Sequence, residues 1–160
     1  MSIMNLARSG LTLWQGLTAG LDSSRPLLAL LARLYVAEAF FLSGLTKIRD
    51  WDTTLALFAD EYHVPLLPTP VAALMGTGGE LVLPVLLALG LGGRFAALGL
   101  SVINVVAVIS LSEIAPAALQ QHITWGVLLA ALSAFGSGNW SADGLLVKPW
   151  LRRRGWQGQP

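Results

Sequence analysis

The chain has 160 residues, of which 54% are hydrophobic and 12% are charged, and its mean hydropathy is +0.65. Soluble domains carry about 25% charged residues, so ten basic and nine acidic side chains would cover a water-facing surface poorly. The composition argues against a soluble domain, and a net charge of +1 gives no reason to expect a nucleic-acid partner. The absence of cysteine excludes disulfides, cysteine-bound zinc and iron–sulfur clusters.

Residues 1–26 form an N-terminal segment in which apolar positions alternate with polar ones. Asn5, Arg8 and Gln15 interrupt the apolar residues, so the continuous hydrophobic core of a signal peptide is missing. We expect this segment to form a helix that lies in the membrane interface.

Four apolar runs follow, at about residues 27–45, 70–91, 94–111 and 115–136. A helix needs about 20 residues to cross the hydrocarbon core of a bilayer, and apolar residues surround each run on all sides. We therefore predict an all-α fold, an integral membrane four-helix bundle over residues 27–138. A short interfacial helix is expected at residues 54–62, and a basic, tryptophan-rich tail over residues 139–160.

The basic residues predict the orientation of this bundle. Seven lie on one side of the four spans: Arg8, Arg25, Arg94, Lys148, Arg152, Arg153 and Arg154. The other side has only Lys47 and Arg49, together with five acidic residues. The positive-inside rule then places both termini in the cytoplasm.

A few polar residues lie inside the predicted spans. At about 1.5 Å per residue, Glu38, Glu80 and Asn104 lie about 15 to 16 Å deep, and Arg33 lies about 9 Å deep. A lone charge at this depth costs about 3 kcal/mol, so we expect Arg33, Glu38 and Glu80 to face one another inside the bundle.

Two interpretations of this polar layer remain open. In one, Glu38, Glu80 and Arg33 are catalytic groups that relay protons, and Arg33, Asn104 and Lys47 bind a cofactor such as a quinone. In the other, the layer is a buried ion-pair network that fixes the helix register. As an alternative role, Lys47 and Arg49 would anchor the outer end of the first span.

A metal site is a separate candidate at the outer face. His63, Met75 and His122 all fall near that face, and soft methionine and histidine donors suit copper. The alternative for His122 is a hydrogen bond at the outer end of the fourth span.

Three stretches resemble the DoxX family of membrane proteins over roughly residues 30–146. They are ARLYVAEAFFLSGLTKIRDW (32–51), GELVLPVLLALGLGGRFAALGL (79–100) and GSGNWSADGLL (136–146). Within them, Gly44 and Lys47 match a Gly-x-x-Lys motif, Glu80 begins the second-helix signature, and Arg94 follows a glycine-rich turn. The resemblance implies a four-helix bundle in the bacterial inner membrane.

The same resemblance suggests a setting. Relatives include a subunit of a thiosulfate:quinone oxidoreductase, and the phrase FADEYHVPLLP resembles a subgroup encoded beside copper-binding, bufferin-like peptide systems. We expect an accessory or membrane-anchor subunit of a redox or copper/metal-stress system, with the lipid bilayer and a protein partner or a second copy as its contacts. The alternatives are a quinone-linked oxidoreductase membrane subunit and an oligomeric transporter of small solutes or metals. Whether the chain is an enzyme stays open.

Overall fold

The structure, a computed structural model, describes residues 3–154. Its helices are α1 (Ile3–Arg49), α2 (Trp51–Asp60), α3 (Thr69–Leu89), α4 (Gly93–Ser110), α5 (Pro116–Phe135) and α6 (Lys148–Arg153), with a π-helical turn η1 (Asp143–Val147) before α6. No β-strand occurs among these residues, where an isolated bridge between Tyr62 and Leu111 is the sole sheet-like pairing. The prediction of an all-α fold is confirmed.

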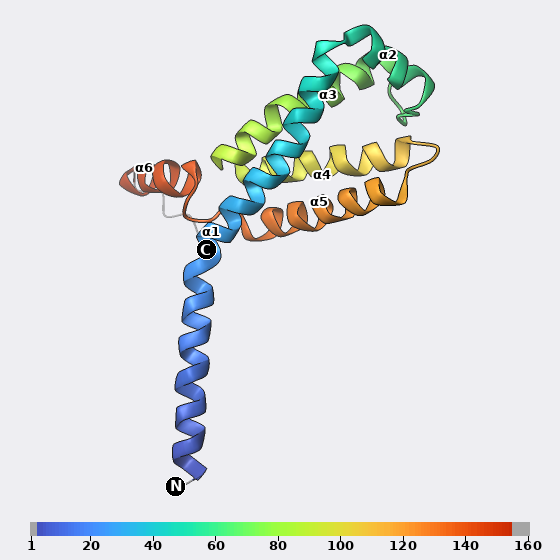
Figure 1. Cartoon of the computed structure of the whole chain (residues 1–160). Helices are drawn as coiled ribbons and strands as arrows, with labels where there is room; N and C mark the ends of the chain where they lie inside the picture. The colour runs from blue at the N-terminus through green and yellow to red at the C-terminus, as the bar shows by residue number, and fades with distance from the viewer. Residues whose placement is uncertain (1–2, 155–160) are drawn as a thin grey trace.

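The N-terminal segment and the first span form one helix rather than two. Figure 1 shows α1 as a continuous helix whose first half projects away from the other helices. The expected boundary near residue 26 is not a helix end, because α1 continues through Pro26. A proline inside a helix removes one backbone hydrogen bond. The neighbouring hydroxyls of Ser23 and Ser24 donate back to the carbonyls of Gly20 and Leu21, at 2.7 and 2.8 Å.

Three segments are long and apolar enough to cross a membrane: Gly10–Arg49 of α1, α3 and α4. The fourth expected span corresponds to α5, which has 20 residues. Its first half carries Gln120, Gln121 and His122, so its apolar character is weaker. The helices show a membrane protein with three candidate spans, and α5 packs beside them.

The bundle is held by α1 against α3, α3 against α4, and α4 against α5 (Figure 1). Its core contains Val36, Phe40, Leu87, Ala96, Ala97, Leu100, Leu129 and Leu132. A small residue allows the close approach of α3 and α4, since a Cβ atom at Gly79 would lie 2.5 Å from Ile103 Cδ1. Such contacts between small residues are typical of helices packed within membranes.

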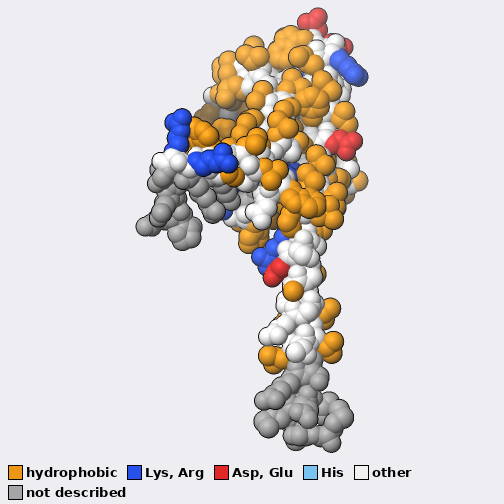
Figure 2. Space-filling view, turned by 90° about the vertical axis from the view of Figure 1, so that its left-hand side faces the viewer, with side chains coloured by type: hydrophobic (Ala, Val, Ile, Leu, Met, Phe, Trp, Pro, Cys, Tyr) orange, Lys and Arg blue, Asp and Glu red, His pale blue; other side chains and the backbone are white. Residues whose placement is uncertain are grey.

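Hydrophobic side chains cover most of the bundle face that Figure 2 displays, and charged side chains are sparse there. Exposed apolar residues occur on all three candidate spans, for example Leu42, Val82 and Val102. Because such a surface is unfavourable in water, a lipid bilayer is the environment that it fits.

The short helix α2 follows α1 directly and packs on α3. It begins three residues earlier than the expected 54–62 helix because Asp50 caps it. Asp50 Oδ1 accepts from the Thr53 backbone N–H at 3.0 Å, and Oδ2 accepts from the Thr53 hydroxyl at 2.7 Å. The side chain of Thr54 also donates to the Lys47 carbonyl at 2.8 Å, which ties α2 to the end of α1.

Candidate functional site

An ion pair between α1 and α3 lies inside the bundle. Lys47 Nζ is 2.6 Å from Glu80 Oε1 and 2.5 Å from Oε2, and it also donates to Ser43 Oγ at 3.2 Å. The two side chains are only 12% and 8% exposed. Lys47 therefore does not act as an outer anchor: it turns inward because Glu80 needs a counter-charge there. Arg49, two residues later, is exposed.

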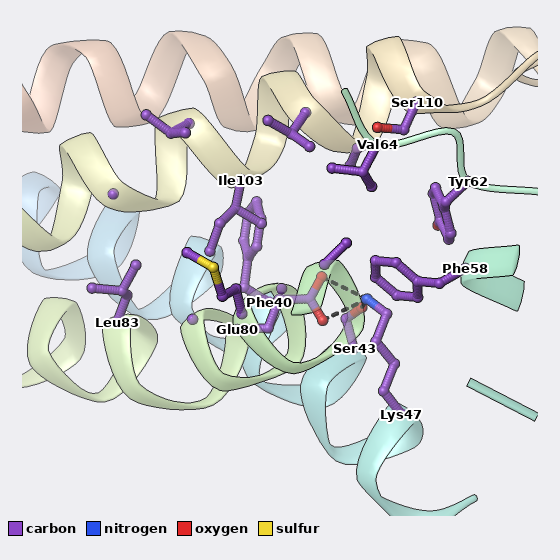
Figure 3. A pocket seen from close by; sticks show the side chains of 18 of the residues that line it. Phe40, Ser43, Lys47, Phe58, Tyr62, Val64, Glu80, Leu83, Ile103 and Ser110 are labelled. Atoms are coloured by element: carbon purple, nitrogen blue, oxygen red, sulfur yellow. Dashed lines mark hydrogen bonds and ion pairs between the residues drawn. The ribbon is translucent and has the colours of Figure 1, made fainter. Parts of the chain in front are cut away.

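This pair forms part of the wall of a cavity of about 550 Å³, which we call the Lys47–Glu80 cavity. Side chains from all five helices α1 to α5 line it, and most of them are apolar. Figure 3 shows Phe40, Leu83 and Ile103 on one side, Phe58 and Tyr62 on another, and the ion pair below them. Cavities of this size with few polar groups are typical of small-molecule sites.

Three further polar groups line the cavity beside the pair. Ser110 Oγ and Trp125 Nε1 are buried and have no hydrogen-bond partner within the described chain. Tyr62, between α2 and α3, also lines it, and burial first, then the charges of Glu80 and Glu61, raise the pKa of its phenol. The Tyr62 hydroxyl therefore stays protonated, so the cavity presents several unused donors to a ligand.

Asn104 and His122 connect α4 to α5 at the same cavity. Asn104 Nδ2 donates to the His122 backbone carbonyl at 2.9 Å, and Asn104 Oδ1 is 2.8 Å from His122 Nδ1. The His122 ring meets Trp125 edge-on at 5.1 Å between centroids, and Trp125 meets Phe40 at 5.5 Å. The Asn104 side chain is therefore occupied with α5, while His122 and Trp125 line the cavity.

Arg33 lies elsewhere, at the end of the bundle where α3 turns into α4. It is fully buried, and its Nη2 donates to the carbonyl of Trp140. Trp140 lies between α5 and η1, in residues 136–142, which we call the C-terminal loop. Directly after that loop, the carboxylate of Asp143, the first residue of η1, accepts from the backbone N–H groups of Gly92 and Gly93, at 3.1 and 3.2 Å. Arg33 thus ties the C-terminal loop to α1, while its buried Nε and Nη1 have no hydrogen-bond partner within the described chain.

The expected meeting of Arg33, Glu38 and Glu80 is wrong. Glu38 is exposed on α1, and the partner of Glu80 is Lys47. At about 100° per residue, Glu38 lies about 140° around the helix from Arg33, whereas Lys47 lies within about 40° of it. The inward face of α1 therefore includes Arg33 and Lys47 and excludes Glu38. The angular position of each residue around α1 was therefore a sequence signal for the partner of Glu80, and an estimate of membrane depth alone leaves it out.

The copper candidates are not gathered into one site. His63 is exposed and lines a smaller neighbouring cavity of about 250 Å³, while Met75 and His122 line the Lys47–Glu80 cavity. One ring nitrogen of His122 is already bonded to Asn104. Among residues 3–154, no group of three or more histidine or acidic side chains could hold a metal ion.

Comparison with protein-family models gives a match, and it covers the helices that form the Lys47–Glu80 ion pair. The DoxX family model matches residues 28–113, which is more than half of the chain and contains Lys47, Glu80 and Asn104. No curated protein and no solved structure matches. The matched range covers the bundle part of α1 together with α2, α3 and α4. The chain belongs to the DoxX family of membrane proteins.

Proposed function

We propose that this chain is a membrane subunit that binds the polar head of a small lipid-soluble molecule, of the quinone type, in the Lys47–Glu80 cavity. One observation carries the proposal: a buried ion pair lies in the wall of an otherwise apolar cavity of about 550 Å³. A buried ion pair adds little to stability compared with apolar residues of similar volume. The presence of this ion pair beside an open cavity is therefore better explained by ligand binding than by a gain in stability.

The chemistry of the cavity suits a ring that carries oxygen atoms. Lys47 can donate a charge-assisted hydrogen bond to a ligand oxygen, and Glu80 can accept one or take a proton. The apolar walls supplied by Phe40, Leu83 and Ile103 suit the ring and the start of an isoprenoid tail. A quinone-linked redox role for the subunit follows from this fit.

The proposal includes a topology in which α5 is the fourth span and both termini face the cytoplasm of a bacterial cell. Arg94, the second residue of α4, donates to the Ala134 carbonyl near the end of α5, beside the loop that Arg33 holds. Arg153 in α6 follows the same loop. The positive-inside rule supports this end of the bundle as the cytoplasmic end in the inner membrane. A copper setting stays a prediction from the resemblance alone.

A binding measurement tests the proposal. The full chain, purified in detergent, is titrated with decylubiquinone, and bound and free ligand are separated by equilibrium dialysis. We expect saturable binding that falls about tenfold or more in the Lys47→Met/Glu80→Met double variant, because a hydrogen bond to a charged group contributes about 1.5–3 kcal/mol.

The matched control is Arg49→Met, which removes an exposed basic residue near the same helix end. Its affinity should equal that of the unmodified chain. Absence of binding to the unmodified chain, or equal affinity in the double variant, would contradict the proposed site.

A further inference from the structure

The contact between Asn104 and His122 sets which nitrogen of the imidazole carries the proton. The amide nitrogen of Asn104 donates to the His122 carbonyl, so its Oδ1 is the atom that faces Nδ1 at 2.8 Å. An amide oxygen can only accept a hydrogen bond. His122 Nδ1 must therefore be the donor, and in the neutral ring Nε2 is left as an acceptor.

The ring that carries this acceptor lines the Lys47–Glu80 cavity. No described side chain donates to Nε2, although Nδ1 is occupied. Beside it stands Trp125, whose ring centroid is 5.1 Å from that of His122 and whose buried Nε1–H has no acceptor within the described chain. An unused acceptor and an unused donor thus lie on adjacent rings of one cavity wall.

A single hydroxyl group can satisfy both. Its hydrogen can be donated to His122 Nε2 while its oxygen accepts from Trp125 Nε1–H. A carbonyl oxygen can accept from Trp125, but it has no hydrogen to donate to Nε2, so one of the two hydrogen bonds is lost.

We propose that His122 is a specificity residue that makes the cavity favour a ring with a free hydroxyl, such as a hydroquinone or phenol, over the corresponding carbonyl form. The inference rests on the proposed function, because it concerns the ligand of the same cavity. Asn104 acts as a positioning residue: it holds the proton on Nδ1 and does not touch the ligand.

The test compares decylubiquinol with decylubiquinone, which share a tail and differ in the ring oxygens. Both affinities are measured on the purified full chain by equilibrium dialysis, without oxygen so that the reduced form persists. The unmodified chain should bind decylubiquinol about 2- to 10-fold more tightly, which is the contribution of one neutral hydrogen bond.

Two variants separate the nitrogens of His122. His122→Asn keeps a polar group near the Nδ1 position and should abolish the preference, while decylubiquinone affinity changes less than about twofold. His122→Gln places an amide near the Nε2 position and should keep a preference for decylubiquinol. Circular dichroism and gel filtration confirm that each variant is folded.

The outcomes distinguish the two proposals. If neither ligand binds, the proposed function fails and this inference falls with it. If both ligands bind the unmodified chain equally, the ligand site stands and only the role of His122 is overturned. Loss of the preference in both variants alike would show that the whole imidazole supports the cavity, which also overturns the assignment to Nε2.

Discussion

Replacing Glu80 with glutamine should destabilise the protein strongly, although glutamine has nearly the same shape. The change removes the negative charge from two contacts of 2.6 and 2.5 Å and leaves the Lys47 ammonium, 12% exposed, in an apolar wall. Breaking a buried pair by removing one partner costs about 3–5 kcal/mol. We expect a loss near the lower end, about 3 kcal/mol, because Ser43 still accepts from Lys47.

The assay is reversible unfolding of the purified chain in mixed detergent micelles, followed by circular dichroism. Glu80→Gln is measured alone, and a double-mutant cycle then compares Glu80→Leu and Lys47→Met with Lys47→Met/Glu80→Leu. Since an apolar replacement of both partners is often neutral, Lys47→Met/Glu80→Leu should recover most of the stability that either single variant loses. The interaction free energy from this cycle should be about 3 kcal/mol or more in favour of the pair, because each single loss exceeds the loss in the double variant.

Additive effects would refute the reasoning. If the double variant loses the sum of the two single losses, Lys47 and Glu80 do not interact in the folded protein. The same conclusion follows if Glu80→Gln alone changes the unfolding free energy by less than about 0.5 kcal/mol, the range of an ordinary surface substitution.

Three other outcomes are expected. Gly93→Ala should lower the unfolding free energy by about 1–3 kcal/mol through overpacking between the start of α4 and the C-terminal loop, because its added methyl group would lie 2.9 Å from Ser137 Cβ, whereas Gly78→Ala, with open space around its added methyl group, should be neutral in the same assay. Hydrogen bonds lower the pKa of the Asp50 carboxyl, so the cap on α2 is fully formed above the ordinary aspartate value of about 3.9 and is lost as pH falls through the lower folded value. The protection of α2 amides against hydrogen exchange, taken relative to the intrinsic rate at each pH, should therefore fall at acidic pH, and Asp50→Asn should remove that pH dependence. Arg33→Met should free the Trp140 carbonyl and speed amide exchange in the C-terminal loop about tenfold or more, since a hydrogen bond from a charged group contributes about 1.5–3 kcal/mol.

The helices could be predicted well because each depends on a local pattern. Long apolar runs, the Gly92-Gly93 turn and the polar residues after Arg49 marked the spans and their ends. The N-terminal boundary was the exception. By composition the apolar run begins after Pro26, but the backbone of α1 stays helical on both sides of that residue.

The site was predicted less well because it depends on rotation and on distant contacts. Glu80 and Asn104 were placed correctly inside the bundle by depth alone, and both are buried. Predicting which residue pairs with Glu80 required the angular position of each candidate around α1, and that position favours Lys47 over Glu38. The bond from Arg33 to Trp140 joins residues far apart in the chain, so no local pattern could predict it.

The length of α1 bears on how its first half is covered. Forty-seven residues extend about 70 Å, whereas about 20 residues cross a bilayer, so α1 projects far beyond the bundle. Along that projection Leu13, Trp14, Leu17 and Leu21 lie within about 100° of arc and are exposed, Leu13 by 71%. Figure 1 shows that α1 changes direction between its projecting half and the bundle, and the helix contains Pro26. The bundle half can therefore cross the membrane while the projecting half lies along the membrane interface, where lipid would cover this apolar stripe.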